Sequence, residues 1–137
     1  MGRILALDYG TKRVGIAVTD PLKIIASSLD TIHPNEVINY ISAYVLKEPV
    51  ELIVVGLPTQ MNGKPSESEA HIIPFLKKLK QQIPNIPVIR YDERFTTKMA
   101  ISSMIEGGYK KKERQDKKRL DSISATLILQ GYLLSTQ

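Results

Sequence analysis

Three acidic residues stand at positions where a carboxylate could do chemistry. Asp8 directly follows the apolar run 4–7, and Glu93 belongs to the stretch 92–95 that follows a predicted strand at 87–91. Ligands of open α/β sheets bind beyond the carboxyl ends of the strands, so acids at those ends carry more weight than acids elsewhere. The third acid, Asp121, falls in the first turn of a helix predicted over 118–134, on a face that is otherwise apolar. A carboxylate turned inward needs a cation or hydrogen-bond donors, because burial alone costs desolvation energy.

Each acid also has an ordinary structural explanation. Asp8 could cap the turn at 8–13 through its own backbone, and Asp121 could complement the dipole of its helix. The three together indicate a metal site made of oxygen ligands. The chain has no cysteine, and neither His33 nor His71 has the spacing of a metal ligand or the setting of a general base. Carboxylates alone suit Mg²⁺ or Mn²⁺ and suit zinc poorly.

The elements that must position these acids follow the order βββαβαβαα. Apolar runs and turn residues predict strands at 4–7, 14–18, 24–32, 52–56 and 87–91, and helices at 35–47, from 66 onward, at 96–106 and at 118–134. The unbroken apolar run 52–56 is typical of a central, parallel strand. We therefore predict an α/β fold whose five-stranded mixed sheet has its first three strands antiparallel and its last two parallel, flanked by helices.

The second predicted helix has a candidate capping box at its start and a proline in its interior. Ser66 and Glu69 have the spacing of a capping box, which would start the helix there. Pro74 lies inside the helix and should kink it or delay its start. The preceding loop, 56–63, follows a central strand, so it is either a substrate-facing loop or a plain connection.

Composition and charge narrow the class of protein. A chain of 137 residues without cysteine is expected to form a single domain, 1–137, and to be a cytoplasmic protein with no secretion signal and no membrane span. The net charge is +5, and the segment 110–119 holds seven basic residues against two acidic ones. One basic segment on an otherwise neutral chain favours a polyanionic partner such as nucleic acid, although such runs are also found in solvated loops.

Four stretches in this order resemble the landmarks of a known family. They are DYGTKRVGIA at 8–17, GLPTQMNG at 56–63, DERFTT at 92–97 and KKRLDSISA at 117–125. They are similar to the YqgF family, whose members are described as Holliday junction resolvases or pre-16S ribosomal RNA nucleases with an RNase H-like fold. The resemblance implies that fold, and it implies that Asp8, Glu93 and Asp121 are the catalytic acids. Ser124, where the family more often has Ala, and Pro74 depart from its pattern, but neither is one of the acids.

The function implied is metal-dependent hydrolysis of phosphodiester bonds, processing the 5′ end of pre-16S ribosomal RNA in ribosome biogenesis. Asp8 would bridge two Mg²⁺ or Mn²⁺ ions, and Glu93 and Asp121 would complete their shells. The expected substrate-binding cations are Lys12, Arg13, Arg94, Lys110, Lys111, Lys112 and Lys117. The expected partners are structured RNA, branched DNA and ribosomal particles, with the protein a monomer or a weak homodimer.

Other functions stay open from the sequence. One is a Holliday junction resolvase acting in DNA recombination or repair, and another is a nucleic-acid-binding factor without catalytic activity. The three acids argue against the second of these. The stretch 8–11 also resembles the first phosphate loop of the actin and sugar-kinase group. Those proteins close two domains on ATP, and 137 residues would supply one.

Overall fold

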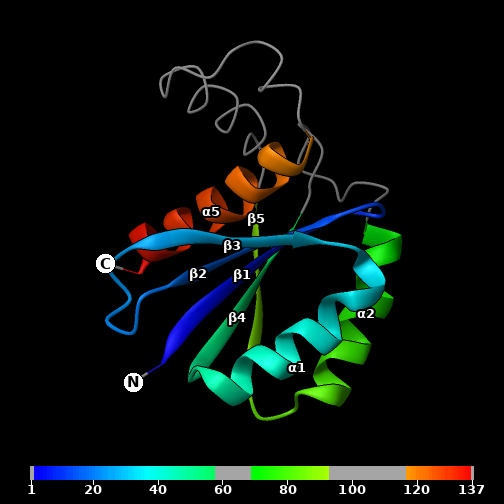
Figure 1. Cartoon of the computed structure of the whole chain (residues 1–137), viewed down its shortest axis with the longest axis horizontal. Coiled ribbons are helices and arrows are strands. Elements are labelled where there is room, and N and C mark those ends of the chain that lie inside the picture. The colour runs from blue at the N-terminus through cyan, green and yellow to red at the C-terminus, as the bar shows by residue number, and fades with distance from the viewer. Residues whose placement is uncertain (1, 58–68, 93–116, 137) are drawn as a thin grey trace.

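Five strands form one mixed sheet in the order β3-β2-β1-β4-β5 (Figure 1). The computed structural model describes residues 2–57, 69–92 and 117–136, with 117–122 described as backbone. The strands are β1 (Arg3–Tyr9), β2 (Val14–Thr19), β3 (Ala26–Ile32), β4 (Val50–Leu57) and β5 (Val88–Asp92). The pairs β1/β2 and β2/β3 are antiparallel, while β1/β4 and β4/β5 are parallel. The predicted topology is confirmed, and the apolar run at 52–56 lies in β4 between two parallel neighbours.

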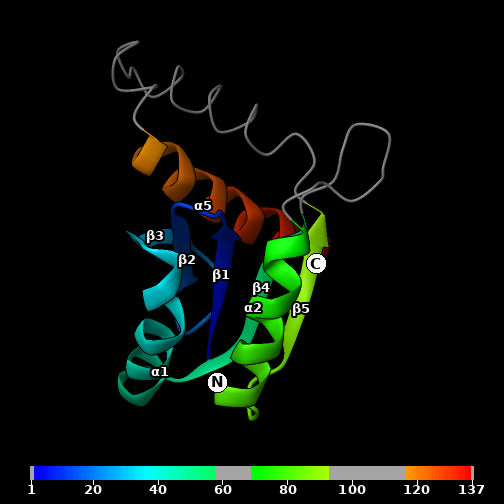
Figure 2. The same cartoon turned by 90° about the vertical axis from the view of Figure 1, so that its right-hand side faces the viewer.

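Helices cover both faces of the sheet. Helices α1 (Val37–Lys47) and α2 (Glu69–Gln82) lie side by side on one face, and α5 (Lys117–Ser135) lies on the other (Figures 1 and 2). This three-layer arrangement explains why the central strands are almost wholly apolar, since both of their faces are buried. In the described part of the chain, no helix is long and apolar enough to cross a membrane.

The alternation of side chains along β1 divides the core into two clusters. Leu5 and Leu7 pack with α1 and α2, and Ile4 and Ala6 pack with α5. The cluster on the α5 face contains three small residues, Ala6, Ala17 and Ala125. Gly131 lies on the same helix, against the ring of Tyr91. A Cβ atom built on Gly131 would lie 2.6 Å from the Tyr91 hydroxyl oxygen and 3.0 Å from Cζ of the same ring. Glycine at position 131 therefore leaves room for the Tyr91 ring, which reaches from β5 to the backbone of α5.

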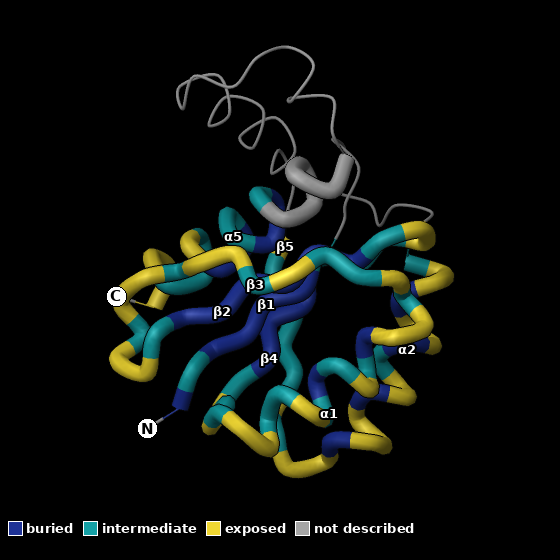
Figure 3. Tube along the Cα trace, in the orientation of Figure 1, coloured by how far each residue is buried: buried dark blue, intermediate teal, exposed yellow. Residues whose placement is uncertain are grey.

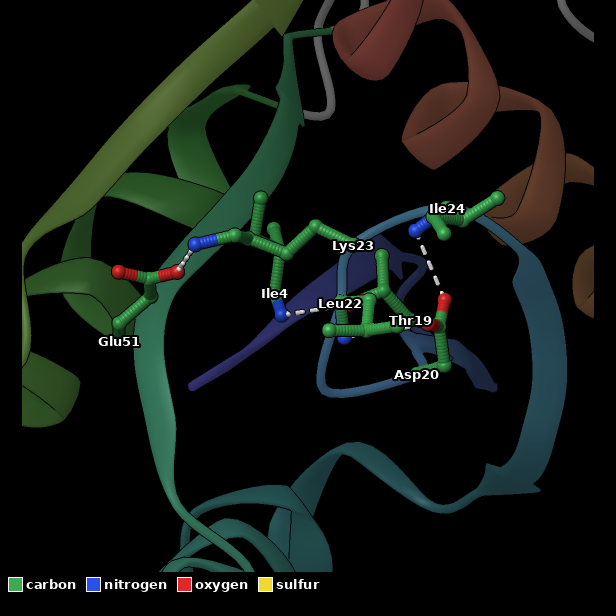
Figure 4. A network of polar contacts seen from close by, with 7 residues as sticks. All are labelled: Ile4, Thr19, Asp20, Leu22, Lys23, Ile24 and Glu51. Atoms are coloured by element: carbon green, nitrogen blue, oxygen red, sulfur yellow. Dashed lines mark hydrogen bonds and ion pairs between the residues drawn. The ribbon is translucent and has the colours of Figure 1, made fainter. Parts of the chain in front are cut away.

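The strand predicted at 24–32 begins only at Ala26, so the prediction was two residues too long at its start. The reason is the side chain of Asp20. Its carboxylate accepts hydrogen bonds from the backbone N–H groups of Leu22 (3.1 Å), Ile24 (2.8 Å) and Ile25 (2.7 Å). Figure 4 shows the Asp20 side chain bonded to Ile24. Residues 20–25 therefore form a turn in place of strand, and Lys23 takes a left-handed backbone conformation with φ of 59°.

The helix predicted at 35–47 starts with a short 3₁₀ turn, η1 (Pro34–Glu36), before α1. His33 caps this turn, because its Nδ1 accepts a hydrogen bond from the Asn35 N–H at 3.1 Å. His71 is exposed on α2. His33 therefore has a structural position and His71 a surface one.

Helix α2 continues through Pro74. Its start is not delayed to Pro74, and the missing proline N–H falls on the exposed side of the helix. Ser66 of the predicted capping box and the helix predicted at 96–106 lie outside the described residues. The side chain of Glu69, the other member of the box, is engaged by Arg90.

Candidate active site

The carboxyl ends of β1, β4 and β5 meet at one edge of the sheet because the three strands are parallel. Leu7 of β1 pairs with Val55 of β4, and Leu57 of β4 pairs with Asp92 of β5. Asp8 follows Leu7 and pairs with Gly15 on the other side. With neighbouring strands about 5 Å apart, the backbone of Asp8 lies roughly 10 Å from the end of β5. The structure thus brings Asp8 and the strand that leads to Glu93 to the same edge.

The strand alternation also decides the face on which Asp8 lies. Ile4 and Ala6 face α5, so Asp8, two residues further, lies on the α5 face as well. Tyr9 lies on the opposite face, where its ring centroid is 4.6 Å from that of Phe75. Asp8 is half-buried. Burial raises the pKa of Tyr9, so its hydroxyl stays protonated at neutral pH.

Helix α5 runs back across the sheet in roughly the direction opposite to β1 (Figure 1). Its C-terminal residues Tyr132 and Leu133 border a hollow of about 420 Å³ together with Ile4 and Leu52, at the amino ends of β1 and β4. The first turns of α5, which contain Asp121 in their backbone, therefore lie toward the carboxyl edge. Ala125 and Ile128, one and two turns later, are fully buried against the sheet, as predicted for this face of the helix.

The turn between β1 and β2 places two cations beside Asp8 in the chain. The Gly10 N–H donates a hydrogen bond to the Arg13 carbonyl oxygen at 2.9 Å. A Cβ atom on Gly10 would lie 2.7 Å from that same oxygen, so this turn requires glycine. Lys12 at the tip is exposed, and Arg13 is half-buried. A flexible ammonium and a guanidinium next to a strand-end carboxylate can both contact a phosphate group.

Arg90 lies at the same edge of the sheet, on the face covered by α2, and its side chain bonds to both β4 and α2. It donates to both oxygens of Glu69, at 2.6 and 3.1 Å, and to the carbonyl oxygens of Val55 at 3.3 Å and Gly56 at 2.9 Å. This clamp joins the ends of β4 and β5 to the start of α2. We did not predict it, although a lone arginine within the apolar stretch 88–91 was a signal that a buried acceptor must exist.

The other predicted site residues are placed only in part. Glu93, Arg94, Lys110, Lys111 and Lys112 lie outside the described residues, and Lys117 and Asp121 are described as backbone of α5. Within the described ranges, no group of three His, Cys, Asp or Glu side chains lies together. The assignment of Asp8, Glu93 and Asp121 to one metal site therefore stays a prediction. Their donor atoms are all carboxylate oxygens, which fit Mg²⁺ or Mn²⁺.

A family model described as "RuvX: Holliday junction resolvase" matches residues 2–135 of the chain. The chain belongs to the RuvX family. A protein of Parabacteroides distasonis named "Putative pre-16S rRNA nuclease" is 55% identical over 135 residues, covering 98% of this chain and 96% of that protein. A protein of Christiangramia forsetii with the same name is 56% identical over 133 residues, covering 97% and 98%. Membership places this RuvX chain among nucleases, which are hydrolases of ester bonds.

Solved structures with a similar fold include RuvC of T. thermophilus in complex with a Holliday junction substrate. It superposes with a TM-score of 0.55 at 15% identity, covering 99% of this chain and 96% of that one. A second structure of Thermus thermophilus RuvC gives a TM-score of 0.52. At this identity the likeness concerns the fold, and it confirms the RNase H-like fold that the sequence motifs implied.

Proposed function

We propose that this RuvX member is a metal-dependent nuclease that processes the 5′ end of pre-16S ribosomal RNA. One structural observation carries the proposal: Asp8 lies on the α5 face of β1, at the sheet edge to which the end of β5 and the first turns of α5 also lead. The names of the relatives, pre-16S rRNA nucleases at 55% and 56% identity, support the choice of RNA as substrate.

Asp8, Glu93 and Asp121 would hold Mg²⁺ or Mn²⁺ through their carboxylate oxygens. The bound ion supplies charge neutralisation at the phosphate and a water molecule of lowered pKa. The residues of the chain bind and orient the substrate. Lys12, exposed at the tip of its turn, and Arg13 would contact phosphate oxygens beside Asp8. Arg94, Lys110, Lys111, Lys112 and Lys117 would extend this phosphate contact along the nucleic acid.

The test is a cleavage assay on a precursor 16S fragment with its 5′ extension, on a four-way DNA junction and on single strands, each with Mg²⁺, with Mn²⁺ and with chelator. We expect cleavage of the RNA precursor with metal and none with chelator. Asp8→Asn should abolish cleavage, while Asp30→Asn, the same chemical change at an exposed position of β3, should leave the rate unchanged. Equal rates for wild type and Asp8→Asn would refute the proposal.

The family description favours one further candidate, the Holliday junction resolvase. Faster cleavage of the junction than of the RNA precursor would select it. If neither is cut while both are bound, the protein is a binding factor without catalytic activity. Ribosomal particles are the proposed partner for the processing of pre-16S ribosomal RNA alone. Co-sedimentation with ribosome precursors would therefore distinguish that function from junction resolution. The cytoplasm, where such precursors occur, is the proposed location.

Metal binding has a readout besides activity. A ligand that binds only the native state at about 100 times its Kd stabilises it by about 2.7 kcal/mol. For 137 residues this corresponds to a rise in Tm of roughly 9 °C. Asp8→Asn should remove this rise. Without metal the same variant should be slightly more stable than wild type, because it relieves repulsion among three nearby carboxylates. A less stable metal-free variant would contradict their clustering.

Nucleic-acid binding and phosphodiester cleavage should depend on different residues. Replacing Lys110, Lys111 and Lys112 by Ala should weaken binding to every sequence and lower the salt dependence of log K by roughly 0.7 to 0.9 per lost phosphate contact. Turnover at saturating substrate should persist. The acid variants should still bind while their single-turnover rate collapses, since the metal acts mainly in the transition state. Loss of turnover in the lysine variant alone would place the chemistry elsewhere.

A further inference from the structure

Arg90 stands in β5, three residues before Glu93, and all three nitrogens of its guanidinium donate hydrogen bonds. Nη1 and Nη2 donate to the two carboxylate oxygens of Glu69, at 2.6 and 3.1 Å. Nη2 and Nε donate to the carbonyl oxygens of Gly56 and Val55, at 2.9 and 3.3 Å. A planar guanidinium presents its donors in a fixed fork, so these acceptors are held in one arrangement. Arg90 therefore fixes the ends of β4 and β5 and the start of α2 relative to one another.

The two carbonyl oxygens belong to the part of β4 that separates Asp8 from β5. Leu7, which precedes Asp8, pairs with Val55. Gly56 pairs with Tyr91 of β5. Figure 2 shows the first turn of α2 at this same end of the sheet. The spacing between Asp8 and the chain that leaves β5 is therefore set across the stretch of β4 to which the guanidinium is bonded.

The end of β5 is also anchored on the opposite face of the sheet. Tyr91 packs with α5, and a Cβ atom built on Gly131 of that helix would lie 2.6 Å from the Tyr91 hydroxyl oxygen. Arg90 and Tyr91 are neighbours in the strand, so one side chain points toward α2 and the other toward α5. Figure 3 shows the central strands as the buried middle of the molecule. Glu93 is the second residue after Tyr91, so it follows a strand end that is held on both faces.

Stability alone does not call for an ion pair at this largely buried place. Apolar residues of similar volume can often replace a buried ion pair at little cost to the fold. Directional hydrogen bonds differ from apolar contacts because they fix the distances and angles between the groups that they join. Active sites need such fixed geometry, since a misplacement of about 1 Å can lower a rate by about 100-fold. The clamp formed by Arg90, Glu69 and the two carbonyl oxygens thus has the properties of a support for the acids.

We propose that Arg90 is a positioning residue that sets the spacing between Asp8 and the end of β5, from which the chain continues to Glu93. The guanidinium lies on the α2 face of the sheet and Asp8 on the α5 face, so Arg90 acts through the backbone of β4 and β5. The proposal rests on the proposed function, because it takes Asp8 and Glu93 as acids of one site. It also implies that a variant which destabilises the fold elsewhere should cleave at the wild-type rate.

Single-turnover cleavage tests the proposal on the nucleic acid that the wild type cleaves, at a temperature where thermal unfolding shows every variant to be folded. Arg90→Met should lower the rate at saturating substrate by about 10- to 100-fold, the range typical of groups that orient metal ligands, while its Kd for nucleic acid changes by less than about threefold. Arg90→Lys should lie between Arg90→Met and the wild type, because an ammonium keeps the charge beside Glu69 but lacks the planar fork. Thr19→Val is the matched control: it removes the buried acceptor of the Ile4 N–H, at the amino end of β1, and should keep the wild-type rate.

Metal affinity gives a readout that needs no nucleic acid. Mn²⁺ raises the Tm of a protein that binds it in the native state alone, so a titration followed by calorimetry yields the Kd for Mn²⁺. Arg90→Met should raise this Kd by about tenfold, and Thr19→Val should leave it unchanged. If Arg90→Met does not fold, Arg90→Lys and Glu69→Gln provide the same comparison with smaller changes.

The outcomes separate the positioning role from the proposed function. Arg90 variants that match Thr19→Val in both the cleavage rate and the Kd for Mn²⁺ overturn the positioning role, even when the wild type cleaves. A Thr19→Val variant that loses as much activity as Arg90→Met also overturns it, since the rate then follows stability. A wild type that binds Mn²⁺ and cleaves nothing refutes the proposed function, and the Kd of the Arg90 variants then decides the positioning role by itself. A wild type that neither binds Mn²⁺ nor cleaves refutes both.

Discussion

Replacing Arg90 by Met should be among the most destabilising single changes to the described part of the chain. The Arg90 side chain is 24% exposed and that of its partner Glu69 is 13% exposed, so the pair is largely removed from water. Arg90 donates two hydrogen bonds to the Glu69 carboxylate and one each to the carbonyl oxygens of Val55 and Gly56. The Met side chain fills much of the space but leaves the carboxylate and both carbonyls without this donor.

Removing one partner of a buried ion pair costs about 3 to 5 kcal/mol, mainly because the remaining charge stays desolvated. A chain of 137 residues has an unfolding entropy of roughly 290 cal/mol/K, so this loss lowers Tm by about 10 to 17 °C. Glu69→Gln should cost less, because its amide oxygen can still accept from Arg90 and the guanidinium keeps the carbonyl oxygens of Val55 and Gly56 as acceptors. The double variant Arg90→Met with Glu69→Leu should recover much of the stability, since apolar replacement of a buried pair is often close to neutral.

Urea unfolding followed by circular dichroism would measure these differences, with calorimetry as an independent check of Tm. Lys80→Met provides the control for the change of charge, because Lys80 is exposed on α2 and should alter the free energy of unfolding by less than about 0.5 kcal/mol. A loss below about 1 kcal/mol for Arg90→Met would refute the reasoning. A double variant as unstable as the single one would show that packing, and not the unpaired carboxylate, dominates.

Three further changes test other parts of the fold. Thr19→Val should cost about 1 to 3 kcal/mol in urea unfolding, because the buried Thr19 Oγ1 accepts from the Ile4 N–H at 2.9 Å, whereas Thr19→Ser keeps this acceptor and should cost less. Hydrogen bonds from backbone N–H groups, the one from Ile25 foremost, lower the pKa of Asp20. The contribution of the Asp20 carboxylate to the free energy of unfolding is therefore present above its unfolded pKa of 3.8 and is lost as pH falls through its folded pKa. In an acid titration, Asp20→Asn should lose less stability than the wild type over that pH range. Gly131→Ala should lower Tm even though Ala favours a helix by about 1 kcal/mol, and adding Tyr91→Phe should restore part of the loss, because the Tyr91 hydroxyl oxygen is the atom nearest to the new Cβ.

The order of elements and the topology of the sheet were predictable from the sequence. Short apolar runs bounded by turn residues identify strands, and few connections between such elements are physically allowed. The same pattern predicted Asp8 directly after a strand at 4–7, and in the structure it is the second-last residue of β1, still at the carboxyl end of that strand. Asp8 interrupts the apolar run at the carboxyl end of the strand, where open α/β sheets bind their ligands. The motifs also implied the RNase H-like fold, because they span the chain in one fixed order.

Only the tertiary structure decided which side chains meet. Arg90 and Glu69 are 21 residues apart, and Thr19 binds the backbone of Ile4 across a strand pair, so no local pattern could assign these partners. The turn at 20–25 was also beyond the sequence, since apolar periodicity does not reveal that the Asp20 side chain captures three later N–H groups. Hydrophobic patterns report burial one segment at a time, whereas specific hydrogen bonds and close approaches depend on distances between segments that exist only after the sheet and helices have packed.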